Sequence, residues 1–381
     1  MIIVYLKKRG AEKVQRGHLW IYEDEIKSVD SDEEVGIANI FFEDEFMGRG
    51  LYNLRANPRL KLLTRKYEEI NEEFFVRRFQ SALKRRSSLL TSFRREFNAE
   101  GDLIPSLIID RFADTLVVQI RSKALEKMKE DMINAMVKVY APMTIYERSD
   151  FESMPEPGLS REKGVLYGLY PTEKTLEEDK LKFKVNIVKG QKTGFFYDQR
   201  ESRTFAKKVA VKGGKALDLF TYTGGFAISL ASEGMKVDAV DISKEDLQLA
   251  SENAKLNKVK VNFICQDAFN LNGLEMYDLI IADPPSLIKN RSQKPKAFEL
   301  LKTLMDQIID HLNENGKFSI CSCAYNIDEE MLKKIVLRSA TEKKKVVRLI
   351  NWTGLPLDHP HLLSMPETNY LKCLWGEIFN F

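Results

Sequence analysis

The alternation of short β-rich runs and helical segments after residue 213 constrains the fold of this chain more than any other feature. Residues 215–219 and 237–240 have the pattern of strands, and residues 226–233 between them have the pattern of a helix. The same alternation continues towards the C-terminus, and it predicts an open parallel sheet with helices on both faces. Residues 176–381 are therefore expected to form one α/β domain.

The residues before this sheet predict two smaller domains. Residues 1–66 contain short β-rich runs broken by turns, including 2–6 and 46–52, which indicates a small β module. Residues 67–175 predict a helical arm followed by a compact α+β unit. The chain is long enough to divide into these three parts, each with its own core.

The helical arm is expected to be one long helix over residues 72–97, because apolar side chains recur on one face from Phe79 to Phe97. Its other face would carry the most concentrated basic stripe of the chain: Arg77, Arg78, Lys84, Arg85, Arg86, Arg94 and Arg95. Charge pattern alone explains such a stripe equally well as a solvated face or as an RNA-binding face. We expect it to supply phosphate contacts.

The overall composition leaves the partner open. The chain has 59 Lys and Arg against 56 Asp and Glu, a formal net charge of +3, which neither indicates nor excludes nucleic acid. No apolar run approaches the roughly 20 residues that span a bilayer. The four cysteines form no CxxC pair, so we expect reduced thiols in a cytoplasmic protein. His359 and His361 are interpreted as loop residues, and no metal site is expected.

The first strand of the C-terminal sheet runs into a glycine-bearing turn in ALDLFTYTGGFAISLA. Dinucleotide-binding sheets have a G-x-G-x-x-G turn here, because several glycines let backbone amides surround a pyrophosphate. This turn has Gly224 and Gly225 instead. A nucleoside without phosphate needs one close approach, which Gly224 can provide.

Two aspartates follow at the expected ends of the next two strands, Asp241 in VDAVDIS and Asp267 in ICQDAF. A carboxylate at the first position can accept hydrogen bonds from both hydroxyls of a ribose, and one at the second can accept from an adenine amino group. Each aspartate alone would be explained as the cap of the following helix. Their occurrence with Gly224 on successive strands favours a nucleoside site, since ligands bind at that edge of open α/β sheets.

The fourth and fifth strands end in groups suited to chemistry on a base. Asp283 follows DLIIA and is held by Pro284 and Pro285, and Cys321 and Cys323 share a face of the strand GKFSICSC. A thiolate that adds to carbon 6 of a pyrimidine makes carbon 5 nucleophilic towards a sulfonium methyl group. The alternatives are a structural Pro-Pro turn and two small buried cysteines.

These segments together resemble the PUA-domain-containing ribosomal RNA large-subunit methyltransferases that form 5-methylcytosine. The resemblance covers nearly the whole chain: KKRGAEKVQRGHLWIYEDEI is similar to the N-terminal PUA module, a β barrel that binds RNA, and EGDLIPSLIIDRFADTLVVQI to the middle α+β domain. KTGFFYDQRESR, the glycine turn, QDAF, DPPSL and CSC match the C-terminal methyltransferase domain. The resemblance implies a class I, Rossmann-like methyltransferase sheet.

The resemblance also implies roles for individual residues. S-adenosyl-L-methionine would be contacted by Asp198, Arg200, Phe220, Tyr222, Gly224, Asp241 and Asp267. Cys323 stands where the family has its attacking cysteine, and Asp283 where it has the acid that orients the substrate. The expected product is 5-methylcytosine in large-subunit (23S) ribosomal RNA, formed through a covalent cysteine adduct.

Two other functions stay open on the sequence. The same cofactor site would serve methylation of a guanine or adenine nitrogen in rRNA or tRNA beside Asp283, with the cysteines as packing. The chain would otherwise be a non-catalytic RNA-binding assembly factor. The sequence does not reveal the oligomeric state, and a homodimer is one possibility.

Overall fold

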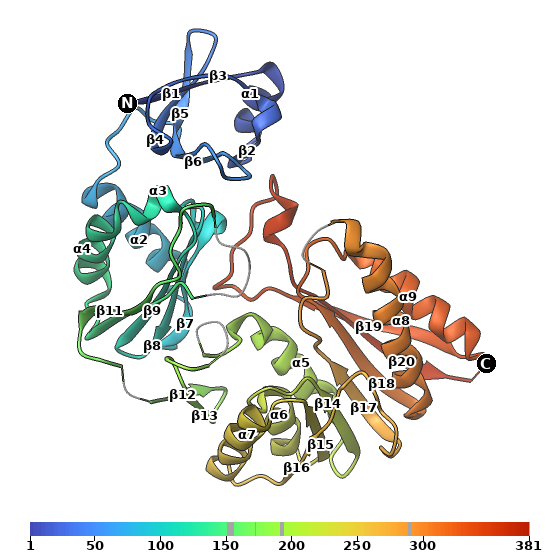
Figure 1. Ribbon diagram of the computed structural model, residues 1–381. Coiled ribbons are helices and arrows are strands. Elements are labelled where there is room, and N and C mark those ends of the chain that lie inside the picture. Colours follow the sequence, from blue (N-terminus) through green and yellow to red (C-terminus); the bar gives the residue numbers. More distant parts are fainter. Residues whose placement is uncertain (151–155, 172, 191–193, 289–290, 381) are drawn as a thin grey trace. The chain divides into compact units, whose positions relative to one another are not determined.

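The computed structural model describes residues 1–150, 156–171, 173–190, 194–288 and 291–380 (Figure 1). The chain forms two compact units. Unit 1 comprises Met1–Leu176, Val185–Tyr197 and Leu357–Thr368, and unit 2 comprises Glu177–Lys184, Asp198–Pro356 and Asn369–Phe381. The chain therefore passes between the units more than once, and each unit is described by itself.

The N-terminal part of unit 1 is a six-stranded sheet in the order β2-β6-β5-β4-β1-β3. Strand β1 (Ile2–Leu6) shows why it forms: its side chains alternate, so that Ile2, Val4 and Leu6 enter the core. β5 and β6 approach so closely that a Cβ at Gly48 would lie 2.2 Å from the carbonyl oxygen of Thr64. The other elements are α1 (Lys8–Gln15), β2 (Trp20–Ile21), β3 (Ile26–Asp30), β4 (Val35–Phe42), β5 (Glu45–Asn53) and β6 (Leu60–Thr64).

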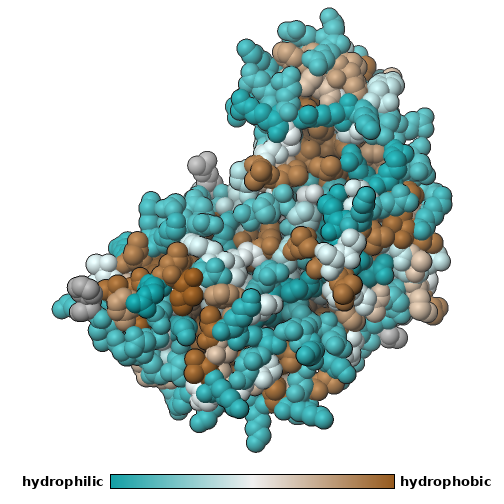
Figure 2. All heavy atoms as spheres, turned by 180° about the vertical axis from the view of Figure 1, so that it is seen from behind, coloured by the Kyte–Doolittle hydropathy of each residue, from teal (hydrophilic) through white to brown (hydrophobic). Residues whose placement is uncertain are grey.

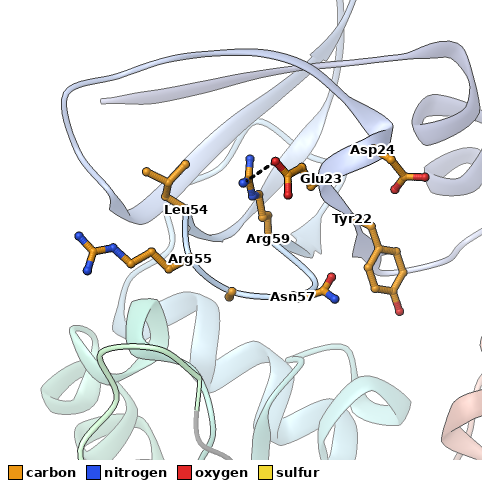
Figure 3. A pocket seen from close by; sticks show the side chains of 8 residues that line it. Tyr22, Glu23, Asp24, Leu54, Arg55, Asn57 and Arg59 are labelled. Carbon is orange, nitrogen blue, oxygen red and sulfur yellow. Dashed lines mark ion pairs between the residues drawn. The ribbon is translucent and has the colours of Figure 1, made fainter. Parts of the chain in front are cut away.

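A pocket of about 560 Å³ lies in this N-terminal sheet, between the turn after β2 and the loop after β5 (Figure 3). Two arginines line it, and both are engaged by carboxylates. Arg59 pairs with Glu23 at 2.7 Å and Arg55 with Glu34 at 2.9 Å. Its lining is thus charged, and each of the two arginines is paired with a carboxylate.

The rest of unit 1 is a five-stranded sheet in the order β11-β10-β9-β8-β7, with helices α2 and α4 packed against each other (Figure 1). α2 begins at Asn71, whose side chain accepts a hydrogen bond from the backbone N–H of Phe74 at 3.2 Å. The elements are α2 (Glu72–Arg85), β7 (Phe93–Asn98), β8 (Leu107–Phe112), β9 (Thr115–Ile120), α3 (Lys123–Glu126), α4 (Lys129–Tyr140), β10 (Thr144–Arg148) and β11 (Lys163–Gly168).

The expected helix over residues 72–97 is wrong, because α2 ends at Arg85 and residues 93–98 form strand β7. The apolar residues of the strand continued the helical period by coincidence. The continuous basic face therefore does not exist, and several of its members are engaged inside unit 1. Arg94 pairs with Glu96 at 3.2 Å, and Arg95 pairs with Asp110 at 2.5 Å.

Arg86 lies in the interior of unit 1 with 0 % of its side chain exposed. Its guanidinium donates to the fully buried carboxylate of Asp102 at 2.6 Å and to the carbonyl oxygen of Asp358 at 2.8 Å. A buried charge is tolerated only when it is paired and hydrogen-bonded in this way. The segment 357–368 is thus held to unit 1 by polar contacts to a buried cation.

Unit 2 contains a seven-stranded sheet in the order β16-β15-β14-β17-β18-β20-β19. The first five of these strands are parallel, and β20 is antiparallel to both of its neighbours. Leu217 and Leu219 of β14 face a core formed with α8 and α9, whereas Ala216 faces a core formed with α5 and α6 (Figure 1). Helices thus cover both faces, and the expected doubly wound α/β sheet is confirmed.

The strands of unit 2 are β14 (Lys215–Leu219), β15 (Lys236–Asp241), β16 (Val261–Cys265), β17 (Tyr277–Ala282), β18 (Leu312–Ser322), β19 (Val346–Gly354) and β20 (Lys372–Phe379). Its helices are α5 (Arg200–Val209), α6 (Gly225–Ser232), α7 (Lys244–Leu256), α8 (Lys294–Asp310) and α9 (Glu329–Glu342). A hairpin of β12 (Lys174–Glu178) and β13 (Leu181–Val185) precedes them.

In the part of the chain that the structure describes, no helix combines the length and the apolar character needed to cross a membrane. Figure 2 shows one face of the molecule, on which hydrophobic areas are interspersed among hydrophilic ones.

Replacement of Arg86 by Met is expected to lower the free energy of unfolding by about 3–5 kcal/mol, because Asp102 would keep a buried charge without its main partner. Urea titration followed by circular dichroism measures the loss. Arg85→Met is the matched control: Arg85 pairs with the same carboxylate at 2.6 Å, but 42 % of its side chain is exposed. Its effect should stay within about 1 kcal/mol. Equal effects of the two substitutions would contradict this account.

Candidate active site

The candidate site lies at the carboxyl ends of the parallel strands of unit 2, the edge at which open α/β sheets bind ligands. Strands β14, β15, β16, β17 and β18 all end there. Each of them carries one of the residues singled out from the sequence at its carboxyl end, either as its last residue (Asp241 of β15) or within the next two residues.

The turn after β14 has an unusual backbone. Phe220 and Tyr222 have φ angles of +62° and +51°, and Gly224 has +86°. Positive φ is costly for residues with a side chain, so the turn needs outside support. Asp241 provides it: its Oδ2 accepts from the backbone N–H of Tyr222 at 2.9 Å, and its Oδ1 accepts from that of Ser243 at 3.0 Å. The hydrogen bond to Oδ1 lies directly before α7, because Ser243 is the N-cap residue of that helix.

The carboxylate of Asp241 supports the turn and still has hydrogen-bond acceptor capacity left for a ligand. Each carboxylate oxygen can accept about two hydrogen bonds, and each is used once by the backbone contacts described above. The carboxylate is half-buried at the strand tip. Ribose hydroxyls would find acceptors here.

Asp267 follows β16, and its side chain is exposed. Its Oδ1 accepts from the backbone N–H of Phe269 at 2.9 Å, which closes a local turn. The ring of Phe269 packs edge-on against that of Phe220, with centroids 5.0 Å apart. Asp267 and Phe220 thus belong to one local arrangement, a carboxylate beside an aromatic pair, which suits a purine with an amino group.

The sequence analysis missed Asp218, which lies within β14 and is almost completely buried. Its Oδ2 accepts from the Thr221 hydroxyl at 2.5 Å and from the backbone N–H of Ala227 at 2.9 Å. Its Oδ1 has no hydrogen-bond partner among the described residues. The available signal was a carboxylate in an otherwise apolar strand, ALDLF.

Burial raises the pKa of Asp218 to about 7, against the lowering effect of the hydrogen bonds from Thr221 and Ala227. The charges of Asp283 and Asp241 raise the pKa further. The tips of β14, β15 and β17 therefore share one negative field. Such a field suits a positively charged sulfonium and is unsuited to a pyrophosphate.

Asp283 and Cys323 emerge from neighbouring strands. β17 and β18 are parallel with Ala282 opposite Ile320, so Asp283 follows one strand tip and Cys323 extends beyond the other. Both residues are half-buried. The side chain of Cys323 contacts the small cluster of Cys321, Leu371 and Cys373 without being enclosed by it. A thiol and a carboxylate are thus offered at the same edge as the glycine turn.

Cys321 and Cys373 form a disulfide between β18 and β20, so the expectation that all cysteines are reduced thiols is wrong for these two. The residues lie directly opposite each other in the antiparallel pair and are fully buried. The sequence concealed this pairing because β20 is placed beside β18 by the topology, 52 residues later. Cys265 and Cys323 lie outside disulfides.

Asp198 and Arg200 lie at the start of α5. Asp198 is buried, and its Oδ2 accepts from the Tyr370 hydroxyl at 3.0 Å. Arg200 is half-buried and pairs with Glu178 at 3.2 Å, and Arg203 pairs with the same carboxylate at 2.5 Å. Glu178 and Tyr370 are further residues that the sequence analysis did not single out.

The two histidines of the segment 357–368, interpreted from the sequence as loop residues, both lie away from the strand tips in sequence and belong to unit 1. His359 is buried in unit 1, where its Nδ1 lies 2.9 Å from Asp358. His361 is exposed. No group of metal-ligating side chains is found among the described residues.

Comparison with known proteins agrees with this geometry. A family model described as "Methyltransferase domain" matches residues 210–372, and one described as "PUA-like domain" matches residues 4–65. Two solved structures cover 99 % of this chain at 23 % identity: a putative SAM-dependent methyltransferase from Streptococcus mutans, with a TM-score of 0.85, and a putative methyltransferase complexed with SAH, with a TM-score of 0.86. At this identity they show the fold. The chain is a methyltransferase with an N-terminal PUA-like domain.

Curated relatives narrow the class. Ribosomal RNA large subunit methyltransferase I of Tolumonas auensis is 34 % identical over 389 residues, which span 97 % of this chain and 98 % of that protein. The protein of the same name from Aliivibrio fischeri is 34 % identical over 390 residues, with 97 % and 98 % covered. The chain belongs to the ribosomal RNA large subunit methyltransferase I family.

The family resemblance, the fold class and the enzyme class expected from the sequence are thus confirmed. The roles of the single site residues and the domain boundaries at residues 66 and 175 stay predictions.

Asp218 makes stability depend on pH. An acid whose pKa is raised in the folded state stabilises the fold while it is protonated, and this contribution falls as pH rises from about 4 to about 7. Asp218→Asn keeps a neutral side chain at all pH values. The thermal midpoint of the variant relative to wild type is expected to be higher at pH 8 than at pH 5, as measured by circular dichroism. A difference that does not change with pH would contradict the raised pKa.

Proposed function

We propose that this protein forms 5-methylcytosine in large-subunit (23S) ribosomal RNA, with S-adenosyl-L-methionine as methyl donor. The observation that carries the proposal is the thiol of Cys323 at the tip of β18, beside the β17 tip that carries Asp283 and on the edge that holds the glycine turn. The curated relatives named above supply the substrate class.

The residues of the strand tips fit the methyl donor. Asp241 has acceptor capacity left for ribose hydroxyls, and Asp267 would accept from the adenine amino group beside the aromatic pair of Phe220 and Phe269. The backbone of Tyr222 and Gly224 would lie along the nucleoside, and Asp198 and Arg200 would form part of the wall. When bound, S-adenosyl-L-methionine supplies an electrophilic methyl group.

The chain itself would supply covalent catalysis. The Cys323 thiolate adds its sulfur to carbon 6 of the cytosine, and the electrons of the 5,6 double bond make carbon 5 the nucleophile that accepts the methyl group. Loss of the proton from carbon 5 to a base then restores the double bond, and the sulfur–carbon 6 bond breaks to release the thiolate. Asp283 would hold the cytosine amino group or ring nitrogen during these steps. The net change is replacement of one hydrogen by a methyl group.

We assign recognition of the RNA to the PUA-like domain, because the continuous basic face expected over residues 72–97 does not exist. The enzyme is proposed to act in the cytoplasm. It would work as a monomer or as a homodimer, which light scattering of the purified protein distinguishes.

Cys323→Ala is expected to reduce formation of 5-methylcytosine by at least about 10³-fold, because the substitution removes the nucleophile. The measurement is mass spectrometry of nucleosides from 23S rRNA incubated with isotope-labelled S-adenosyl-L-methionine. Cys265→Ser, at the exposed cysteine, is the control and should keep activity within a few-fold.

A Cys323→Ala variant that retained activity would refute the covalent route. The label on a guanine or adenine nitrogen would then establish the alternative chemistry beside Asp283. Absence of any labelled product with the wild-type protein would instead support the non-catalytic assembly factor.

A further inference from the structure

Lys372 occupies a position that the proposed mechanism does not use. It is the first residue of β20 and lies opposite Ser322 of β18, the residue directly before Cys323. The disulfide between Cys321 and Cys373 joins the neighbouring residue pair of the same two strands. A covalent link therefore fixes Lys372 beside the end of the strand that carries Cys323.

The side chain of Lys372 is buried, with a relative exposure of 9 %. Its ammonium group donates to the carbonyl oxygen of Tyr370 at 3.4 Å, a long hydrogen bond. Among the residues that the structure describes, no carboxylate lies within ion-pair distance of it. A lysine is rarely buried in this way unless another group compensates its charge.

The electrostatics identify the compensating groups. Burial lowers the pKa of Lys372, whereas Asp328, Glu329 and Cys323 raise it. Asp328 and Glu329 stand at the start of α9, outside ion-pair distance. Cys323 directly follows Ser322, the strand partner of Lys372, so the two residues hold adjacent positions at the end of the β18–β20 pair. The charge of Cys323 acts on the ammonium, and by reciprocity the ammonium acts on the thiol.

We propose that Lys372 is a positioning residue that stabilises the thiolate form of Cys323. The inference rests on the proposed function only in its consequence, namely that this thiolate attacks the base. An ordinary thiol is mostly protonated at pH 7, and a nearby cation increases the thiolate fraction.

The other charged groups named near this strand tip are carboxylates, and none of them favours formation of the thiolate. Asp328 and Glu329 on α9 and Asp283 after β17 are carboxylates, and Asp198 before α5 is hydrogen-bonded to Tyr370. Negative neighbours disfavour a thiolate. The cation of Lys372 opposes their effect, so its removal is expected to lower the thiolate fraction of Cys323.

The test measures the reactivity of the thiol in the full-length protein without RNA. Native protein is treated with iodoacetamide between pH 5 and pH 10 without reductant, and the alkylation rates of Cys323 and Cys265 are followed by mass spectrometry of tryptic peptides. Cys321 and Cys373 are protected by their disulfide. Cys265 serves as an internal reference in each sample.

Lys372→Met is expected to raise the pH midpoint of Cys323 alkylation by about one unit and to lower its rate at pH 7 about tenfold. Lys372→Arg should restore the wild-type midpoint, because it keeps the charge. Lys317→Met, on β18 six residues before Cys323 and roughly 20 Å away, changes net charge equally and should leave the midpoint unchanged. Lys372→Gln replaces the Met variant if that variant fails to fold.

An unchanged midpoint in folded Lys372→Met protein, or equal shifts with Met and Arg, would overturn the inference. The outcome is independent of the proposed function. A wild-type enzyme that makes no 5-methylcytosine but shows the Lys372-dependent midpoint would refute the function and leave this inference standing.

Discussion

The hydrogen bond from the backbone of Tyr222 to the Asp241 carboxylate is the contact on which the candidate site depends. It joins the tips of β14 and β15 and holds a turn whose positive φ angles would otherwise relax. The strained turn brings the backbone to the place where a nucleoside would lie. The same carboxylate accepts from the backbone N–H of Ser243, the N-cap residue of α7, so ligand-binding capacity and local folding depend on one side chain.

Negative charge is concentrated on the strand tips, and the chain limits its cost in two ways. Asp218 is buried with a pKa of about 7, so part of the population holds a proton near neutrality. On the far side of the sheet edge, Lys372 is buried beside the strand that carries Cys323. The same edge thus combines a cluster of carboxylates with a buried cation.

The sequence predicted those parts of the fold that depend on local apolar patterns, namely the strands and helices of the C-terminal sheet. The strand at 215–219 and the placement of Asp241, Asp267 and Asp283 after strands follow from apolar periodicity and from the rule that ligands bind at strand ends. The helix at 72–97 failed because β7 is apolar at positions that continue the period of α2. The disulfide and Lys372 were missed for a different reason. β20 inserts antiparallel between β18 and β19, and such a long-range pairing has no local signature.

The interleaving of the two units bears on how the protein is made. Residues 357–368 lie between β19 and β20 in sequence but belong to unit 1, where the carbonyl of Asp358 accepts from the buried Arg86. During synthesis from the N-terminus, the interior of unit 1 lacks this acceptor until residue 358 has left the ribosome. The buried Arg86 therefore gains its full set of acceptors only after most of unit 2 has been synthesised. Each unit is built from discontinuous segments, so a single truncation point between them would separate residues that belong to the same unit.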